Sequence, residues 1–178
     1  FRSLYVTAGQ NTGLGVDRIS GVENIISGWG DDVLHGSIQK NSILGGVGDD
    51  TIYGRGGDDI LKGQSGNDVI LDGSGNDKVY GGTGHDVLYD GAGNDLLYGQ
   101  EGNDPFRLGA GNDLLDGGSG NDTLYATGST DYVLQLYLTG GQNTGMGIDT
   151  LRGIENVVSG AGDDIIHGSA VGNSLKAG

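Results

Sequence analysis

The sequence predicts an all-β fold, a right-handed parallel β-roll (a β-solenoid) built from two short parallel sheets. Three observations support this prediction. A nine-residue repeat runs without an insertion from Ser27 to Tyr125, glycine fills much of each repeat, and one apolar residue recurs in every repeat. A chain with these features coils at a fixed period and does not build an ordinary packed core.

The composition limits the possible partners. The chain has 178 residues, a net charge of −15, 40 Gly and no Cys. Its pI is about 4.1. We therefore expect no nucleic-acid partner and no insertion into a membrane, since the charge opposes polyanions and no apolar run approaches the length of a membrane span. Disulfides cannot compensate for the thin core.

The repeat is most regular at positions four, six and eight of the nonapeptide. Position four is Gly in all repeats but the second, which has Gln39. Position six is acidic in all repeats but the second: Asp32, Asn41, Asp50, Asp59, Asp68, Asp77, Asp86, Asp95, Asp104, Asp113 and Asp122. Position eight is always apolar: Leu34, Ile43, Ile52, Leu61, Ile70, Val79, Leu88, Leu97, Phe106, Leu115 and Leu124.

This period predicts the geometry of the coil. We expect each nonapeptide to form a turn of about six residues and a strand of three, with the position-eight side chain pointing inward. Two nonapeptides would complete one coil of eighteen residues. Residues eighteen apart would then lie about 4.8 Å apart in neighbouring coils, and the whole array would be roughly 26 Å long.

The position-six acids are predicted to bind a cation. One edge would stack Asp32 with every second repeat after it, and the other would stack Asn41 in the same way. Carboxylates at such a spacing repel unless a cation lies between them. A hard ion that accepts six to eight oxygen ligands suits these columns, which favours Ca²⁺ over Mg²⁺. Counting the intervals between neighbouring position-six residues on both edges predicts about nine Ca²⁺ ions.

A longer repeat divides the chain. Residues 9–37 recur as residues 141–169, a shift of 132 residues. We expect residues 1–26 to be a lead-in strand with degenerate turns, 27–125 the roll of eleven nonapeptides, and 126–178 a linker strand and the start of a second block. Such blocks predict a larger parent protein with flanking blocks. The candidate ligands of the lead-ins and of the second block are Asp17, Asp149 and Asp164.

The nonapeptides resemble a known family. GGVGDDTIY (45–53), GGTGHDVLY (81–89) and GGSGNDTLY (117–125) match Gly-Gly-x-Gly-x-Asp-x-apolar-x, the calcium-binding signature of the RTX (repeats-in-toxin) proteins. The resemblance implies a β-roll with calcium-binding turns on both edges, and secretion from a Gram-negative bacterium by the type I system. It also implies that backbone carbonyls of the Gly-x-Gly residues complete the calcium shell: Gly46, Gly48, Gly57, Gly66, Gly75, Gly82, Gly84, Gly93, Gly102, Gly111 and Gly120.

Some repeats depart from the signature. Asn41 and Asn173 replace the position-six Asp, and Glu23 and Glu155 stand in the acid place of the lead-ins, so the occupancy of these sites stays open. Pro105 removes a donor from its strand, and we expect a local distortion there.

The sequence predicts a calcium-binding module that folds on meeting extracellular calcium and supports secretion and extracellular stability of the parent. We expect no enzyme activity, since the His-Glu-x-x-His, Gly-x-Ser-x-Gly and P-loop motifs do not occur. The alternative is an adhesive or polysaccharide-binding surface with a glycan or cell-surface partner. The five position-nine tyrosines (Tyr53, Tyr80, Tyr89, Tyr98 and Tyr125) could form a ligand-stacking stripe or could be ordinary β-sheet surface.

Overall fold

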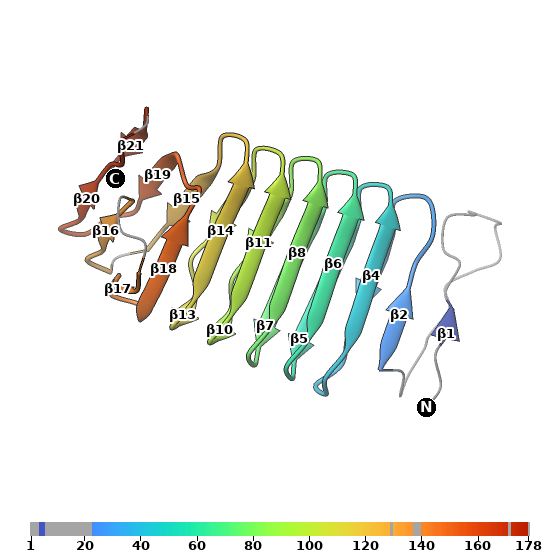
Figure 1. Cartoon of the computed structure of the whole chain (residues 1–178). Helices are drawn as coiled ribbons and strands as arrows, with labels where there is room; N and C mark the ends of the chain where they lie inside the picture. Colours follow the sequence, from blue (N-terminus) through green and yellow to red (C-terminus); the bar gives the residue numbers. More distant parts are fainter. Residues whose placement is uncertain (1–3, 6–22, 129, 137–139, 171, 178) are drawn as a thin grey trace.

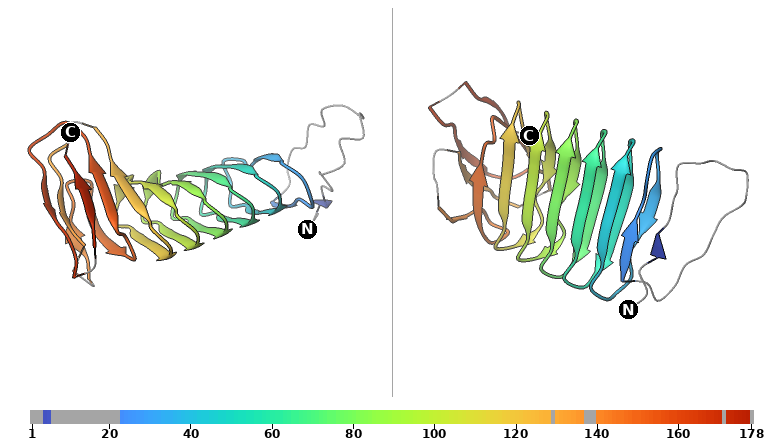
Figure 2. Two further views of the ribbon diagram at one scale, coloured as in Figure 1. Left: turned by 90° about the horizontal axis from the view of Figure 1, so that it is seen from above. Right: turned by 45° about the vertical axis from the view of Figure 1, so that its right-hand side comes forward.

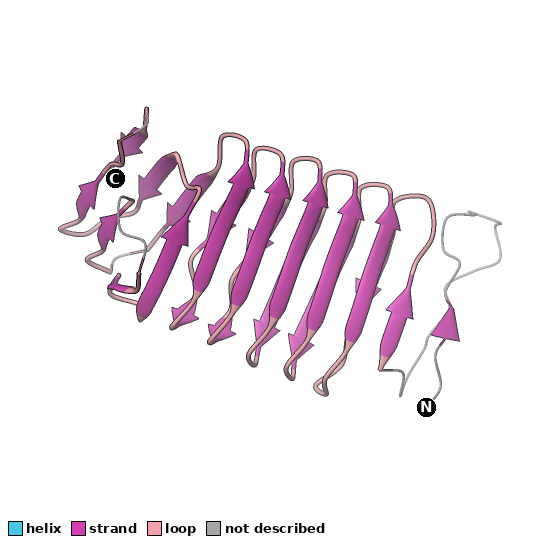
Figure 3. Cartoon of the chain, viewed as in Figure 1, coloured by secondary structure: helices cyan, strands magenta, loops and turns pink. Residues whose placement is uncertain are grey.

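The computed structural model describes residues 4–5, 23–128, 130–136, 140–170 and 172–177, and the regular structure of this part is entirely β-strand (Figure 3). Strands stack side by side into an elongated roll of two layers (Figures 1 and 2). No described segment forms a helix with the length and apolar character needed to cross a membrane. The predicted all-β class and the stacked coils are confirmed.

Two large sheets form the layers. The first runs in the order β1 (Leu4–Tyr5), β2 (Asn24–Ile26), β4 (Ser42–Val47), β6 (Ile60–Ser65), β8 (Lys78–Thr83), β11 (Leu96–Glu101), β14 (Leu114–Ser119), β18 (Ile148–Arg152) and β17 (Gln142–Asn143). The second contains β3 (Val33–His35), β5 (Thr51–Gly56), β7 (Val69–Ser74), β9 (Val87–Tyr89), β10 (Ala92–Gly93), β12 (Pro105–Arg107), β13 (Ala110–Gly111), β15 (Thr123–Ala126), β19 (Asn156–Ser159) and β21 (Ser174–Lys176). A small third sheet pairs β16 (Val133–Gln135) with β20 (Ile165–His167).

The register confirms a coil of eighteen residues. Ile43 pairs with Leu61 and Leu61 with Val79 in the first sheet, all in parallel. In the second sheet Ile52 pairs with Ile70 in the same way. Each coil therefore places one nonapeptide in each layer, and every repeat position forms a column along the roll.

The strands of the array are longer than expected. Seven of them run for six residues and include positions one to three of the next nonapeptide, as in β4 and β5. The expected three-residue strand is therefore wrong for most of the array. Parallel neighbours supply partners to the glycine-rich half as well: Gly46 pairs with Gln64 and Val47 with Ser65. Between two such six-residue strands, only positions four to six of the nonapeptide form the turn.

The position-eight column forms the core. All eleven residues from Leu34 to Leu124 are buried, and Leu34 at the first coil is the most exposed of them at 6%. Leu134, Leu151 and Val157 continue this core beyond the array. The interior is thus one aliphatic or aromatic side chain thick on each layer, as the spacing predicts.

The second block stacks directly on the first. In β18, Leu151 pairs with Leu115, and in β19, Val157 pairs with Leu124. Between β15 and β18 in the sequence, β17 pairs with β18, and β16 pairs with β20 at the same end of the molecule (Figure 1). The lead-in of the second block therefore supplies the next coil of the first.

Pro105 has a local effect only. The pairing of β12 with β9 begins at Phe106 and Leu88, so Val87 has no paired residue in β12. Asp104 nevertheless keeps its place, because its N–H donates to Asp122 Oδ1 at 2.8 Å like the other position-six residues. The expected distortion is confined to one missing pair.

Candidate metal sites

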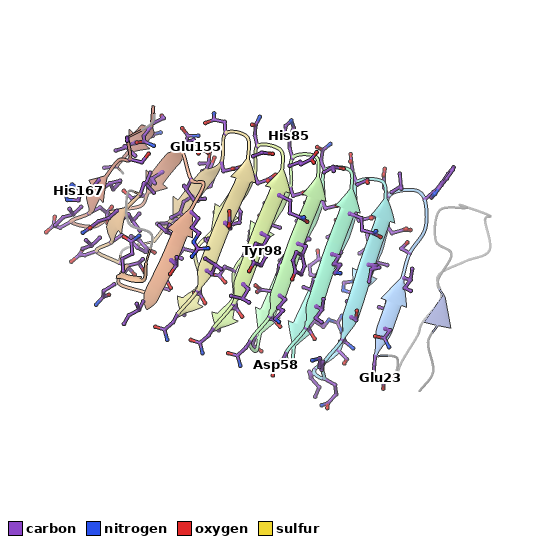
Figure 4. All side chains as sticks on the ribbon, viewed as in Figure 1. Glu23, Asp58, His85, Tyr98, Glu155 and His167 are labelled. Atoms are coloured by element: carbon purple, nitrogen blue, oxygen red, sulfur yellow. The ribbon has the colours of Figure 1, made fainter. Side chains whose placement is uncertain are left out.

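The turns form two parallel edges. Edge one consists of the turns that follow β4, β6, β8, β11 and β14, and it lies at the top of Figure 1. Edge two consists of the turns that follow β5, β7, β10 and β13. Figure 4 shows His85 at edge one and Asp58 at edge two, with side chains directed outward. The position-six residues of the same turns point the other way, into the roll, and are buried.

From Asp50 onward, each position-six carboxylate accepts a hydrogen bond from the coil before it. The N–H of one position-six residue donates to Oδ1 of the residue eighteen positions later, at 2.7–2.9 Å along both edges. Edge one stacks Asp32, Asp50, Asp68, Asp86, Asp104 and Asp122; edge two stacks Asn41, Asp59, Asp77, Asp95 and Asp113. The structure therefore brings together the predicted columns.

The second carboxylate oxygen, Oδ2, has a different environment. Among the described residues it is buried without a hydrogen-bond partner in nine position-six residues: Asp50, Asp59, Asp68, Asp77, Asp86, Asp95, Asp104, Asp113 and Asp122. A buried charged oxygen without a partner costs free energy, at least ~1–3 kcal/mol each. Nine such atoms in register need a common explanation, and a row of cations between the turns provides one.

Burial dominates the electrostatics of the columns. Desolvation raises the pKa of Asp68 to about 6 and that of Asp86 to about 7, although an N–H bond from the coil before lowers both. The neighbouring carboxylates of the column add to the increase. Ionised carboxylates are therefore unfavourable in these turns unless an opposite charge compensates them.

Glycine at position one leaves space beside Oδ2 in six of the position-six residues, namely Asp50, Asp59, Asp68, Asp86, Asp104 and Asp122. A Cβ on Gly63 would overlap Asp68 Oδ2 and the carbonyl oxygen of Gly81. The same holds at Gly81, where a Cβ would overlap Asp86 Oδ2. These six carboxylates thus each face a small cradle lined by backbone carbonyls, which is a suitable donor set for a hard cation such as Ca²⁺.

The predicted glycine carbonyl ligands lie in the turns or next to them. Gly46 and Gly82 are at position two of their nonapeptides, and the others are at position four; all have positive φ. The position-four residues are Gly48, Gly57, Gly66, Gly75, Gly84, Gly93, Gly102, Gly111 and Gly120. Their successive carbonyls point along the edge, since a Cβ on Gly66 or Gly84 would overlap the carbonyl oxygen of the glycine one coil before it.

The column ends use their oxygens differently. Asp32 Oδ2 accepts a hydrogen bond from Ser27 Oγ, and Asp149 Oδ2 accepts one from Thr144 Oγ1. Asp149 extends edge two, because the Asp113 N–H donates to its Oδ1 at 2.8 Å. These two candidate ligands lie in the columns, but a side-chain hydroxyl donates to their Oδ2, the atom that has no hydrogen-bond partner in the nine position-six residues described above.

The degenerate positions are also placed. Glu155 extends edge one, where its Oε2 accepts the Asp122 N–H at 2.9 Å (Figure 4). Asn41 and Asn173 use their amide oxygens within their own turns, each accepting an N–H at 2.6 Å from the Ser four residues before it. Glu23 is exposed at edge two.

Two candidate ligands lie apart from the columns. Asp164 lies next to the small third sheet, where its Oδ1 accepts the Tyr132 N–H at 2.9 Å and its Oδ2 has no hydrogen-bond partner among the described residues. Asp17 lies outside the described residues.

Sequence reasoning missed two further acids. Asp72 and Asp90 replace Gly at position one, and both are buried inside the roll at edge two. Each lies in a group of three carboxylates whose ligand atoms are within 4.8 Å of one another. The available signal was position one itself, which is Gly in seven of the eleven repeats.

Comparison with known families agrees with this geometry. The model of the RTX calcium-binding nonapeptide repeat, which spans four copies, matches residues 26–61, 35–70, 53–88, 71–104, 98–133 and 149–170. No curated protein matches the chain. The matched segments cover most of the chain and coincide with the stacked coils and their buried Asp columns, so the chain belongs to the family of RTX calcium-binding nonapeptide repeats.

Proposed function

We propose that this RTX calcium-binding module couples folding to the calcium concentration outside the cell. The chain stays unfolded in the cytosol, where calcium is scarce, passes through a type I secretion system in that state, and folds when it meets extracellular calcium. In its folded form it stabilises a larger secreted protein. The observation that supports this most directly is the set of nine buried Oδ2 atoms, in two columns, without a hydrogen-bond partner among the described residues.

The energetics favour a coupled process. Each nonapeptide buries one position-eight side chain, which contributes ~1.5–3 kcal/mol, while ordering its nine residues costs ~1–2 kcal/mol per residue in backbone entropy alone. The ionised columns add an electrostatic cost to the calcium-free fold. Calcium bound by Asp50, Asp68 and their equivalents would remove this cost, so that ion binding and folding become one event.

The affinity range of extracellular calcium sites suits this role. Such modules bind calcium with dissociation constants of about 10⁻⁴–10⁻³ M, far above a resting cytosolic concentration. With one ion in each interval between position-six residues, the array would take about nine ions. Mg²⁺ would compete poorly, since it prefers a small octahedral shell and keeps its waters.

We further propose that this segment itself is not catalytic and that any activity of the parent protein resides elsewhere. The outer faces give little support to the adhesive or polysaccharide-binding alternative. Tyr80 and Tyr98 stack on the first sheet with ring centroids 5.2 Å apart, whereas Tyr53, Tyr89 and Tyr125 lie on the second. The five tyrosines therefore do not form one continuous binding stripe.

The test is circular dichroism combined with size-exclusion chromatography, in chelator, in calcium and in an equal concentration of magnesium. We expect an expanded, disordered chain in chelator and in magnesium, and a compact β spectrum in calcium. Equilibrium dialysis against radioactive calcium then gives the number of ions. A compact β spectrum that chelator leaves unchanged would contradict the proposal.

A further inference from the structure

Position one distinguishes the two edges of the roll. On edge one this column reads Gly45, Gly63, Gly81, Gly99 and Gly117 after Ser27. On edge two it reads Gly36, Gly54, Asp72, Asp90 and Leu108. Two successive coils of edge two thus carry a carboxylate where the corresponding coils of edge one carry glycine.

Both carboxylates are fully enclosed. Asp72 is 0% exposed and Asp90 is 8% exposed. One oxygen of each is fixed by the backbone: Asp72 Oδ1 accepts the Gly73 N–H at 2.5 Å, and Asp90 Oδ2 accepts the Gly109 N–H at 2.9 Å. The other oxygens, Asp72 Oδ2 and Asp90 Oδ1, are buried without a hydrogen-bond partner in the described part of the chain.

These two acids join the position-six column of edge two. Asp72 forms one group with Asp77 and Asp95, and within this group the ligand oxygens lie within 4.8 Å of one another. Asp90 forms a second such group with Asp95 and Asp113. Asp95 belongs to both groups, so two adjacent intervals of the column are each lined by three carboxylates.

The charge balance of these intervals differs from that of the rest of the roll. A regular column gains one carboxylate and one interval with each coil, so a divalent ion in every interval leaves an excess positive charge. Asp72 and Asp90 raise the count to two carboxylates per interval, which balances one divalent ion. Charge balance matters most where water is excluded, because the effective dielectric constant is low there.

We propose that Asp72 and Asp90 are calcium ligands, and that the two intervals they enter bind calcium before any interval of edge one. Ligand charge count is a main determinant of calcium affinity in protein sites. Coils around residues 69–116 then fold at a lower calcium concentration than the rest of the array. This inference rests on the proposed calcium-dependent folding and assigns its starting point.

The experiment compares the wild type with the D72N/D90N double variant. The matched controls are D116N and a second acid on an outer surface, D58N, combined to give the same change in net charge. Asp116 lies in β14, at position nine of its nonapeptide, on the outer face, and Asp58 is an exposed position-five residue of edge two. Calcium is titrated at pH 7.5 in competition with a chromophoric chelator.

We expect the tightest class of sites in the wild type to contain two ions, and the D72N/D90N variant to bind these ions about tenfold more weakly. The D58N/D116N control should keep that class. In hydrogen exchange at stepwise calcium concentrations, peptides within residues 69–116 should become protected first in the wild type and lose this lead in D72N/D90N.

A second variant controls for the possibility that D72N/D90N misfolds. D72G/D90G restores the residue found at position one of most coils, so the coil shape is kept while the carboxylates are removed. Its circular dichroism at saturating calcium should equal that of the wild type, with the same loss of the tight class. A titration of D72G/D90G or D72N/D90N that matches the control overturns the assignment. A wild type that does not respond to calcium at all contradicts the proposed function instead.

Discussion

At the scale of the residue, each turn is fixed by two side-chain ladders that run in opposite directions. Inside the roll, the Asp68 N–H donates forward to Asp86 Oδ1 at 2.8 Å. Outside it, the Asn67 N–H donates back to Asp49 Oδ1 at 2.6 Å. Successive turn amides are thereby satisfied without any contact within the turn itself. This arrangement requires the turns to stack closely, which places a strict demand on position four.

Gly84 meets this demand. Its φ is 130°, and a Cβ would overlap the carbonyl oxygen of Gly66 in the preceding coil. We expect Gly84→Ala to lower the free energy of unfolding at saturating calcium by about 1–3 kcal/mol from the backbone conformation alone, and by more if the coils separate. Urea unfolding followed by circular dichroism measures this change.

Gly172→Ala is the control for this substitution. Among the described residues, a Cβ at Gly172 has no neighbour within 4 Å, and the φ of Gly172 lies outside the positive range. Its urea midpoint should equal that of the wild type. Equal destabilisation by the two substitutions would show that close stacking at position four is not what requires glycine.

At the scale of the element, the strands owe their stability to neighbouring coils. The glycine-rich half of each repeat has low β propensity, yet it pairs as strand in β4, β6, β8, β11 and β14. In the six-residue strands the position-two residues have positive φ, including the non-glycine residues Arg55, Gln64 and Gln100. Tertiary pairing therefore overrides local preference, which is why these strands exceed the length that the sequence predicts.

Leu97 tests the contribution of the core to one such strand. It is fully buried in β11, so Leu97→Ala should lower the free energy of unfolding at saturating calcium by about 2–5 kcal/mol. Leu96→Ala is the control, because Leu96 is half-buried on the outer side of the same strand, and we expect a loss of about 0.5 kcal/mol. Similar losses for the two variants would contradict a core formed by position eight alone.

Strict periodicity decided what the sequence could predict. The eighteen-residue register, the buried position-eight column and the stacked position-six acids all follow from residues that recur in almost every repeat. Asp72 and Asp90 break the pattern at position one, and a single acid next to glycine resembles an ordinary turn residue. Only the stacked structure shows that Asp72 lies beside both Asp77 and Asp95, which belong to neighbouring coils.

At the scale of the whole molecule, the roll behaves as one electrostatic unit. The chain has a net charge of −15, and the buried acids of the roll lie in columns whose members raise one another's pKa. Because each coil contacts only its neighbours, stability is roughly a sum of coil and interface contributions. Protons and calcium therefore act on the same set of carboxylates along the full length of the array.

This predicts a characteristic pH dependence without calcium. Desolvation raises the pKa of Asp59, Asp77 and Asp122 to about 6 from an ordinary value of 3.8. A raised folded-state pKa means that the folded chain holds more protons than the unfolded one. The stabilisation from these extra protons is complete at a pH below the unfolded-state pKa, and it is lost as the pH rises through the folded-state pKa. In chelator, the β content should therefore be larger at pH 4.5 than at pH 8.

Asp72 and Asp90 extend the pH range of this loss of stability to higher pH. Burial raises the pKa of Asp72 to about 8 and that of Asp90 further, so the loss of stability continues above pH 7 in the wild type. In D72N/D90N the loss should be complete near pH 8, because Asp86, whose pKa burial raises to about 7, is deprotonated by then. Circular dichroism in chelator from pH 4.5 to pH 9 measures both curves, with sedimentation at low protein concentration to exclude association near the pI of about 4.1.

With calcium the pH dependence of the β content should reverse, because calcium binds the deprotonated carboxylates and acid displaces it. A calcium-free chain whose β content rises with pH would contradict the buried, uncompensated columns.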